Sequence, residues 1–250
     1  ITDISFIEDL AQLVYVDVRL NSGLSASNVI GVKESIDSMG RNVEIKSDYD
    51  LASIVFTDSN FKAAVLSYMG KDSTGEVTEE EAGVIETLDI RNKNIASLTD
   101  LEHFPNLKVL NAGENNLGSE GDLAGLAHVT GLEELHLDAS AITDISGVSV
   151  LVNLKEIIIK GNNITSISAL TGLTGLIRIE AQENPIATLT PLQGLTQLEK
   201  VGITNSTVSQ NDFVTNMGSL ENVTDLYISN NPSLTDISFI EDLAQLVYVD

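Results

Sequence analysis

Residues 154–186 read LKEIIIKGNNITSISALTGLTGLIRIEAQENPI, and the spacing of apolar residues and asparagine that opens this stretch returns 22 residues later. The Ile157-x-Ile159 spacing, with Glu156 before it and Lys160 after it, is typical of a short strand that has one buried face. The side chain of Asn162 can hydrogen-bond loop backbone groups that would otherwise be buried without partners. The stretch therefore predicts a unit of one strand, one tight loop and one return segment.

The same pattern runs through most of the chain. Its units begin at Ile85, Leu107, Leu132, Leu154, Leu176, Leu198 and Val223. Most neighbouring units are 22 residues apart and two are 25 apart. Repeats with a period of roughly 20 to 29 residues are typical of leucine-rich repeats, because no single unit can bury its own apolar face. We therefore predict an α/β solenoid (horseshoe) with a parallel β-sheet on its concave face, 3₁₀ or short helices on its convex face, and helical caps.

Residues 51–83 have the features of an N-terminal cap, which a solenoid needs over its first apolar face. Thr57 or Asp58 is placed to cap a helix that ends at Gly70. Thr78 and the glutamates that follow it predict the start of another helical turn. The repeats then fill residues 84–250.

Residues 1–50 resemble the other end of such a domain, a last repeat followed by a C-terminal cap. Val29, Val32, Ile36 and Met39 have helical spacing, and a strand pattern follows them. This C-terminal cap precedes the N-terminal cap in the chain, which is the reverse of the expected order.

The sequence TDISFIEDLAQLVYVD at Thr2–Asp17 recurs unchanged at Thr235–Asp250, an offset of 233 residues. A slice of a tandem array of similar domains, a permuted or fused chain, and a numbering that does not follow the gene all fit this observation. Because the two copies compete for one place in the stack, residues 1–50 are expected to dock on the open end near Asp250, in the same molecule or a neighbour. Contacts of this kind that do not close produce filaments.

A 22-residue unit that contains Thr-Asp-Ile-Ser and Leu-x-x-Leu closely resembles the internalin-type repeats of bacterial surface proteins. The resemblance covers residues 84–250 and the first two dozen residues. It implies a secreted or wall-attached bacterial protein with a role in cell adhesion, which binds a protein or a glycan through its concave strands.

The candidate ligand-binding residues are those that flank the buried strand positions and point away from the core. Tyr227, Tyr248 and Ile158 are candidate anchors, because exposed aromatic and large apolar groups dominate interface energies. Glu134, Glu156 and Asp138, with His136 among them, form the densest acidic patch and would suit a basic peptide or a cation. The full candidate set is Glu134, His136, Asp138, Glu156, Ile158, Lys160, Arg178, Glu180, Asp225 and Tyr227.

Composition argues against several function classes. The formal net charge of -24 repels nucleic acid and anionic membrane surfaces. No apolar run approaches the roughly 20 residues that span a bilayer. The chain has no cysteine, so it can form neither disulfides nor thiolate metal sites. We therefore expect neither nucleic-acid binding nor membrane insertion.

Motifs that would support catalysis are missing. The three histidines do not have metal-ligand spacing, and no phosphate-binding glycine loop or nucleophile elbow is present. The closest calcium-loop-like stretch, at residues 70–81, lacks the leading carboxylate. We therefore expect no enzyme activity, no catalytic or metal-binding residue and no cofactor.

Two hypotheses of function remain. In the first, the chain is a binding module that uses its concave face. In the alternative, it is a structural protein that assembles head to tail through its duplicated end segments, residues 1–50 and 234–250.

Overall fold

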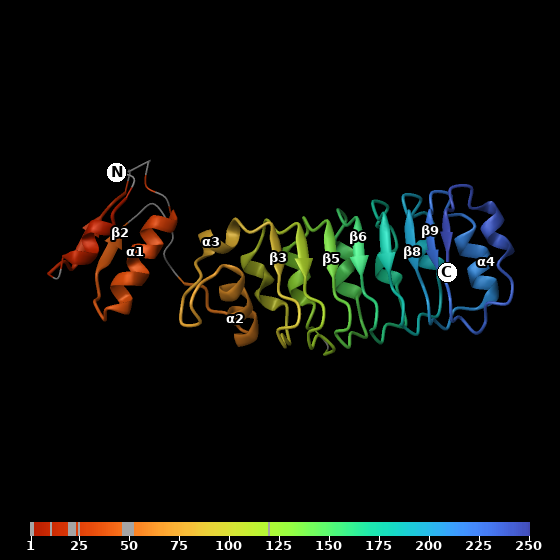
Figure 1. The fold of residues 1–250 in the computed structure, drawn as a ribbon, viewed down its shortest axis with the longest axis horizontal. Helices are drawn as coiled ribbons and strands as arrows, with labels where there is room; N and C mark the ends of the chain where they lie inside the picture. The colour runs from red at the N-terminus through yellow and green to blue at the C-terminus, as the bar shows by residue number, and fades with distance from the viewer. Residues whose placement is uncertain (1–2, 11, 20–23, 25, 47–52, 120) are drawn as a thin grey trace.

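The computed structural model describes residues 3–10, 12–19, 24, 26–46, 53–119 and 121–250, and it has the solenoid fold that the repeats predict (Figure 1). One short strand per repeat adds to a parallel sheet of eight strands in chain order, from β3 to β10. These strands are β3 (Thr87–Asp89), β4 (Val109–Asn111), β5 (Glu134–His136), β6 (Glu156–Ile158), β7 (Arg178–Glu180), β8 (Lys200–Gly202), β9 (Asp225–Tyr227) and β10 (Tyr248–Val249).

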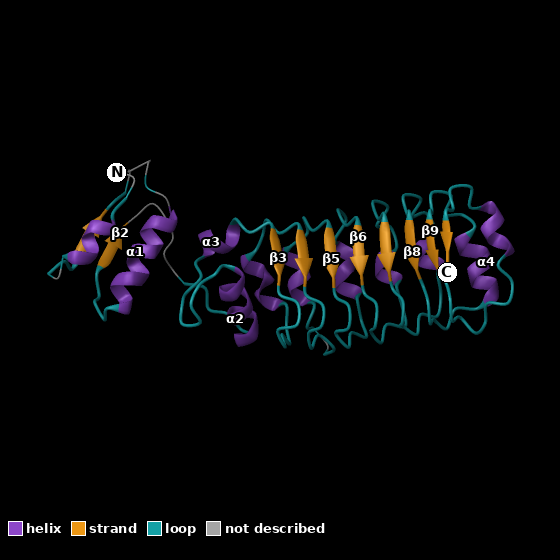
Figure 2. Ribbon diagram, viewed as in Figure 1, coloured by secondary structure: helices purple, strands orange, loops and turns teal. Residues whose placement is uncertain are grey.

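The return segments form short helices on the face opposite the strands (Figure 2). The 3₁₀ helices are η2 (Thr99–His103), η3 (Ala124–His128), η4 (Ser146–Val150), η5 (Ser168–Leu170), η6 (Thr190–Leu192) and η7 (Ser238–Asp242). One of the two 25-residue spacings contains a full α-helix instead, α4 (Gln210–Met217), which the Ser209 hydroxyl caps by accepting from the N–H of Asp212 at 3.2 Å. The extra residues therefore give α4 room to form.

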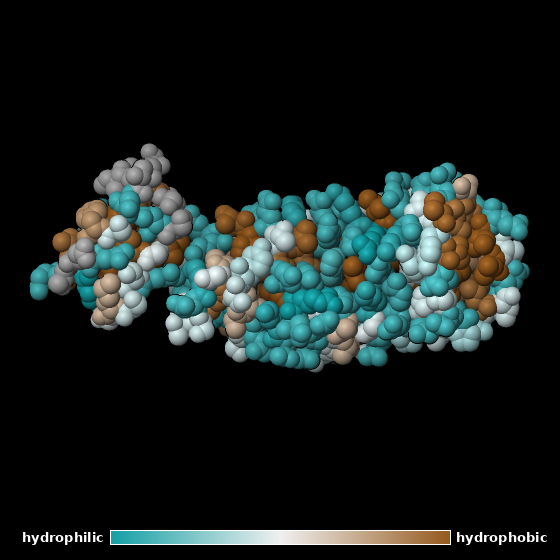
Figure 3. Space-filling model, in the orientation of Figure 1, coloured by the Kyte–Doolittle hydropathy of each residue, from teal (hydrophilic) through white to brown (hydrophobic). Residues whose placement is uncertain are grey.

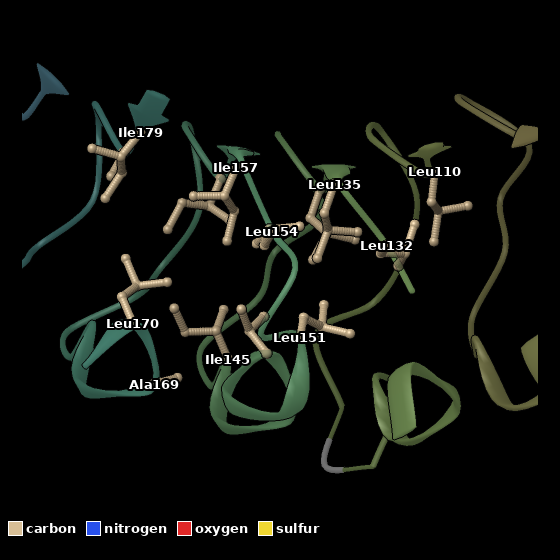
Figure 4. Close-up of a cluster of buried hydrophobic side chains, with 14 of the residues drawn as sticks. Leu110, Leu132, Leu135, Ile145, Leu151, Leu154, Ile157, Ala169, Leu170 and Ile179 are labelled. Carbon is tan, nitrogen blue, oxygen red and sulfur yellow. The ribbon is translucent and has the colours of Figure 1, made fainter. Parts of the chain in front are cut away.

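The core is a continuous column of leucine and isoleucine between strands and helices (Figure 4). Leu135 and Ile157 from the strands meet Ile145 and Leu151 from the return segment, and all four are buried. Each repeat therefore completes the core of its neighbours, as expected for a chain of units that cannot fold singly.

The loop asparagines join one repeat to the next. The Asn162 amide nitrogen donates to the carbonyls of Leu137 and Ile159, at 2.9 and 2.8 Å. Its oxygen accepts from the N–H groups of Ser140 and Ile142, at 2.9 and 3.0 Å. The buried Asn162 side chain thus hydrogen-bonds backbone groups of two consecutive repeats. Similar bonds are made by Asn115, Asn184 and Asn231.

Each loop also has a residue in the left-handed backbone region at one equivalent position, and two loops have a second such residue, Asn94 and Ala141. Glycine meets this requirement at Gly161, where φ is 67°. The equivalent position in the other repeats has φ between 51° and 58° without a glycine: Asn92, Glu114, Ala139, Glu183, Asn205 and Asn230.

The N-terminal cap consists of α2 (Ser59–Tyr68) and α3 (Glu79–Gly83). Of the two predicted capping residues, Asp58 caps α2, and Thr78 forms a capping box with Glu81 on α3. Phe61 packs 5.9 Å from the ring of Phe104, which links the cap to the first repeats.

Residues 3–46 form a separate small unit. It contains η1 (Ser5–Asp9), β1 (Tyr15–Asp17), α1 (Ala26–Ser38) and β2 (Glu44–Lys46). β1 pairs with β2 in parallel, and α1 buries its own apolar cluster against η1. The predicted helix and strand are therefore present, although Met39 lies just beyond the end of α1 and is exposed.

This unit lies beside the N-terminal cap, at the opposite end of the solenoid from the C-terminus (Figure 1). The Lys71 ammonium contacts the Glu34 carboxylate at 3.0 Å across the junction. The expectation that residues 1–50 dock near Asp250 of the same molecule is therefore wrong for the described part of this segment. Because the chain is short between Lys46 and Ser53, the unit stays near the cap. Docking on a neighbouring molecule stays a prediction.

Replacing Asn162 by alanine is expected to destabilise the fold by about 3 kcal/mol, because several buried backbone groups lose their partner. The change is measured by urea unfolding followed by circular dichroism. The neighbouring Asn163 is exposed, so Asn163→Ala is the control and should cost less than about 0.5 kcal/mol. Equal losses in the two variants would contradict this role for Asn162.

Candidate functional site

The outward-facing positions of the strands form aligned columns on the concave face. The register pairs Glu134 with Glu156, Glu156 with Arg178, and Arg178 with Lys200. It likewise pairs Ile158 with Glu180. The structure thus brings the central candidate residues together on adjacent strands.

An ion-pair cluster occupies the middle of this face. Arg178 donates to the carboxylate of Glu156 at 3.0 Å and also binds Glu180. Lys200 and Lys160 approach the two Glu180 oxygens at 2.9 and 3.6 Å. Three cations from three successive repeats, Lys160 after β6, Arg178 on β7 and Lys200 on β8, therefore surround one glutamate.

Glu180 is held ionised although its side chain is only 8% exposed. Burial alone would raise its pKa, but hydrogen bonds from Arg178 and Lys200, together with their charges, lower the pKa to about 2. Burial lowers the pKa of Arg178, but the hydrogen bonds and charges of Glu180 and Glu156 outweigh burial and raise this pKa above its usual value. The cluster is therefore a fixed, fully charged group on the sheet.

A second ion pair crosses a whole repeat. The Arg91 guanidinium binds the Asp138 carboxylate through two bonds, of 2.8 and 2.7 Å, and also binds Glu114 at 2.8 Å. Gly113 lies between them, and a Cβ at this position would stand 2.5 Å from the Asp138 oxygen. The missing side chain is what lets Arg91 reach Asp138.

The predicted acidic patch is therefore largely compensated. Asp138 is paired with Arg91, and Glu156 lies within 3.2 Å of His136 Nε2 and is paired with Arg178. Glu134 is exposed. Among the described residues, no cluster of three or more histidines and carboxylates is arranged to hold a metal ion.

Aromatic residues lie at the C-terminal part of the same face. The rings of Tyr227 and Tyr248 are 5.2 Å apart, and the Lys200 ammonium stands 5.1 Å from the centre of the Tyr227 ring. Gly202 is the neighbour of Tyr227 in the register. The aromatic pair is thus continuous, through Lys200, with the ion-pair cluster.

A shallow depression of about 420 Å³ runs along the edge of this face where the strands begin. It is lined by Glu134, Lys155, Glu156, Ile177, Arg178, Glu199, Lys200, Thr224 and Asp225. Lys155, Ile177, Glu199 and Thr224 are absent from the set predicted from sequence, because they precede the strands by one residue, and Lys200, on β8, is also absent from that set. The sequence contains one indication of this edge. Ile177 is an exposed apolar residue at a position where the neighbouring repeats have the charged residues Lys155 and Glu199.

The stability of the fold is expected to fall as the pH decreases from about 4.5 to about 2, with Glu180 contributing to that fall. The pKa of Glu180 in the folded state, about 2, lies below the ordinary glutamate pKa of 4.5. The stabilisation is therefore complete above pH 4.5 and is lost as Glu180 binds a proton at lower pH. Thermal unfolding of Glu180→Gln should show a shallower pH dependence in this range than the unmodified chain. Glu183→Gln, at an exposed position, is the control, and equal slopes for Glu180→Gln and the unmodified chain would contradict the assignment.

No protein-family model matches the sequence, and no curated protein is significantly similar to it. Solved structures do match. An internalin (InlF) of Listeria monocytogenes is 27% identical with a TM-score of 0.69, and the match covers 78% of this chain and 56% of that one. This chain therefore spans little more than half of that protein.

A second structure, internalin C2 of Listeria monocytogenes, is 25% identical with a TM-score of 0.64, over 78% of this chain and 94% of that one. A leucine-rich-repeat protein of Leptospira interrogans is 23% identical with a TM-score of 0.60, over 70% and 47% of the two chains, and supports the fold alone. The chain is thus similar to these internalins in its repeats, and it has an internalin-like leucine-rich-repeat fold.

Proposed function

We propose that the chain is a binding module whose concave face holds a segment of a protein partner. The observation that carries the proposal is the combination of a fixed charge cluster around Glu180 with the aromatic pair of Tyr227 and Tyr248 on one continuous sheet face. A surface of this kind offers apolar contact and charge recognition side by side.

The ion pairs support specificity. Because Arg178 and Lys200 already hold Glu180, little side-chain freedom is lost when a partner binds over them, and preorganisation of this kind reduces the cost of association. A partner that presents an unpaired charge over this cluster is rejected, which gives discrimination as well as affinity.

The anchors are half-buried side chains that a partner can cover. Ile158 and Tyr227 are partly exposed and stand on either side of the Glu180 cluster. A protein segment with an apolar residue flanked by charges fits this arrangement. A glycan that stacks on the two tyrosine rings is the other ligand class to test.

By likeness to the internalins we further propose that the protein acts outside the bacterial cell, secreted or on the cell surface, in adhesion, and that it is not an enzyme. Among the described residues, no helix is both long enough and apolar enough to cross a bilayer. Attachment to a surface is therefore tested directly, by fractionation of the producing cells.

Ligands are sought by screening the chain against displayed peptide and protein libraries and a glycan array. For a ligand found in this way, Tyr227→Ala and Ile158→Ala are each expected to raise Kd about tenfold or more, because anchor side chains dominate interface energy. The measurement is titration calorimetry or surface plasmon resonance.

The control is Val150→Ala, an exposed apolar residue at the end of η4 on the opposite face. It should leave Kd unchanged. The proposal is contradicted if Val150→Ala weakens binding of the ligand while both concave-face variants leave its Kd unchanged. The ligand would then bind the other face.

A further inference from the structure

The residues that come directly before the strands form a column along one edge of the concave face. The backbone N–H of each one donates to the carbonyl of its counterpart in the preceding repeat, for example Ile177 to Lys155 and Glu199 to Ile177, both at 2.8 Å. Side chains at stacked positions of this kind are neighbours, so successive opposite charges can pair. This edge column contains Lys108, Glu133, Lys155, Ile177, Glu199 and Thr224.

Ile177 interrupts an alternation of charge in the edge column. Lys108, Glu133 and Lys155 alternate in sign, and the Lys155 ammonium binds the Glu133 carboxylate at 2.5 Å. Ile177 follows them, is 39% exposed and does not belong to the apolar core. Because charged residues occupy the equivalent positions in the neighbouring repeats, the fold does not require an isoleucine here. An exposed apolar side chain that the core does not use is a candidate contact for a partner.

Apolar groups are scarce on this part of the molecule. Over β4 to β8 the surface is largely hydrophilic, and apolar side chains appear there as small separate patches (Figure 3). Ile177 is one of the lining residues of the shallow depression of about 420 Å³ at the start of the strands. A hollow surrounds a bound side chain on more than one side, which a flat surface does not. The depression is therefore the place on this edge where an apolar side chain of a partner can be partly buried.

The cations of this depression are already paired. Each of them binds a carboxylate of the chain itself, in the pairs Lys155–Glu133, Arg178–Glu180 and Lys200–Glu180. An acidic partner would have to compete with these carboxylates for the same cations. Within the described part of the chain, the depression thus has no cation that is left without a partner.

Three carboxylates of the depression are in the opposite situation. Among the described residues, no cation lies within ion-pair distance of Glu134, Glu199 or Asp225. Asp225 accepts a hydrogen bond from the Thr224 hydroxyl at 2.7 Å. The depression therefore combines one exposed apolar side chain with three carboxylates that the cations of a partner can pair. The complementary partner is basic.

The three carboxylates lie on both sides of Ile177, which directly precedes β7. Glu199 belongs to the next repeat, Asp225 lies on β9, two strands beyond β7, and Glu134 lies on β5, two strands before it. Two strand spacings are about 10 Å, a distance that about three residues of extended chain span. An apolar residue on Ile177 would therefore bring the residues about three positions before and after it near the outer two carboxylates.

We propose that this depression binds an extended basic segment of a partner protein. One apolar side chain of the segment lies on Ile177, and lysine or arginine stands about three positions away on either side. This binding rests on the role proposed above for the concave face, and it specifies the chemistry of the partner.

Charge and apolar contact have different tasks in this binding. The formal net charge of -24 draws basic segments towards the chain, whereas an acidic segment would meet three unpaired carboxylates. Charge alone does not discriminate between basic segments, because the surface of the chain is acidic over much of its area. Ile177 supplies the discrimination, since only a segment with an apolar residue between its cations covers it.

Methyl NMR of the intact chain, labelled at isoleucine, tests the contact directly. The probe is the end-blocked peptide Gly-Arg-Ser-Ser-Leu-Ser-Ser-Arg-Gly, and its two controls replace leucine by serine or both arginines by glutamate. The probe is expected to shift the Ile177 methyl signal saturably at millimolar concentrations. Loss of the leucine should raise Kd about fivefold, as for one partly buried apolar side chain, and the glutamate peptide should leave the signal unchanged.

Variants of the chain give an independent measurement, by fluorescence anisotropy of the labelled probe. Ile177→Thr, which introduces the residue type that Thr224 has in the same column, should raise Kd about fivefold. The same variant assigns the Ile177 methyl signal by its loss. Glu199→Gln should raise Kd about threefold, the size expected for an exposed ion pair. The control Glu183→Gln removes the same charge at an exposed position beyond the other end of β7 and should leave Kd unchanged.

A saturable shift of Ile177, with weaker binding in Ile177→Thr and Glu199→Gln, supports the proposal. Shifts spread over many isoleucines, with equal effects of Glu199→Gln and Glu183→Gln, would reveal general attraction to an acidic surface and overturn it. Absence of an Ile177 shift at several-millimolar probe also overturns it. Thermal unfolding of each variant shows that a change in Kd does not come from loss of the fold.

Failure of this site and failure of the proposed function are distinguishable. Ligands from the library screen are measured against the variants of both sets. A ligand whose Kd rises with Tyr227→Ala and Ile158→Ala, but not with Ile177→Thr, overturns the site at Ile177 and leaves the concave-face module in place. A ligand whose Kd is unchanged in all three variants contradicts both.

Discussion

The fold depends on one requirement, which is that the loop backbone inside the solenoid receives its hydrogen bonds from buried asparagine side chains. A loop turned inwards exposes N–H and C=O groups to an apolar core, where unpaired groups are costly. Asn162 meets that need for groups in two repeats at once, so neither repeat is complete alone. The stacking of the repeats and the need for the N-terminal cap both follow from this dependence.

The repeat pattern was sufficient to predict the sheet and its register, because every buried position is set by one short spacing. The columns that contain Glu134, Glu156 and Arg178 lie next to one another as the pattern requires. The pairing of charges was not predictable, since Arg91 reaches Asp138 in addition to the nearer Glu114 only because Gly113 leaves the space. The repeat period does not indicate which side chains can contact each other across two repeats.

Other features escaped the pattern for equally local reasons. The left-handed position of each loop is filled mostly by residues other than glycine, such as Glu114 and Ala139, so no glycine signal marks it. α4 replaces a 3₁₀ helix where three residues are added, and the spacing alone indicated only a longer return segment. The small unit lies beside the N-terminal cap because only a short stretch of chain joins Lys46 to Ser53. Its similarity to a terminal repeat gave no information about this position. The residues proposed to bind a ligand are gathered on one face, and their role stays a prediction.

The bridge from Arg91 to Asp138 has a consequence for how the array unfolds. In a linear stack each unit ordinarily interacts with the units directly before and after it, so fraying proceeds one unit at a time. Arg91 belongs to the β3 repeat and binds both Glu114 of the β4 repeat and Asp138 of the β5 repeat. Arg91 thereby couples three consecutive repeats next to the N-terminal cap, so these three repeats are expected to unfold together rather than one at a time.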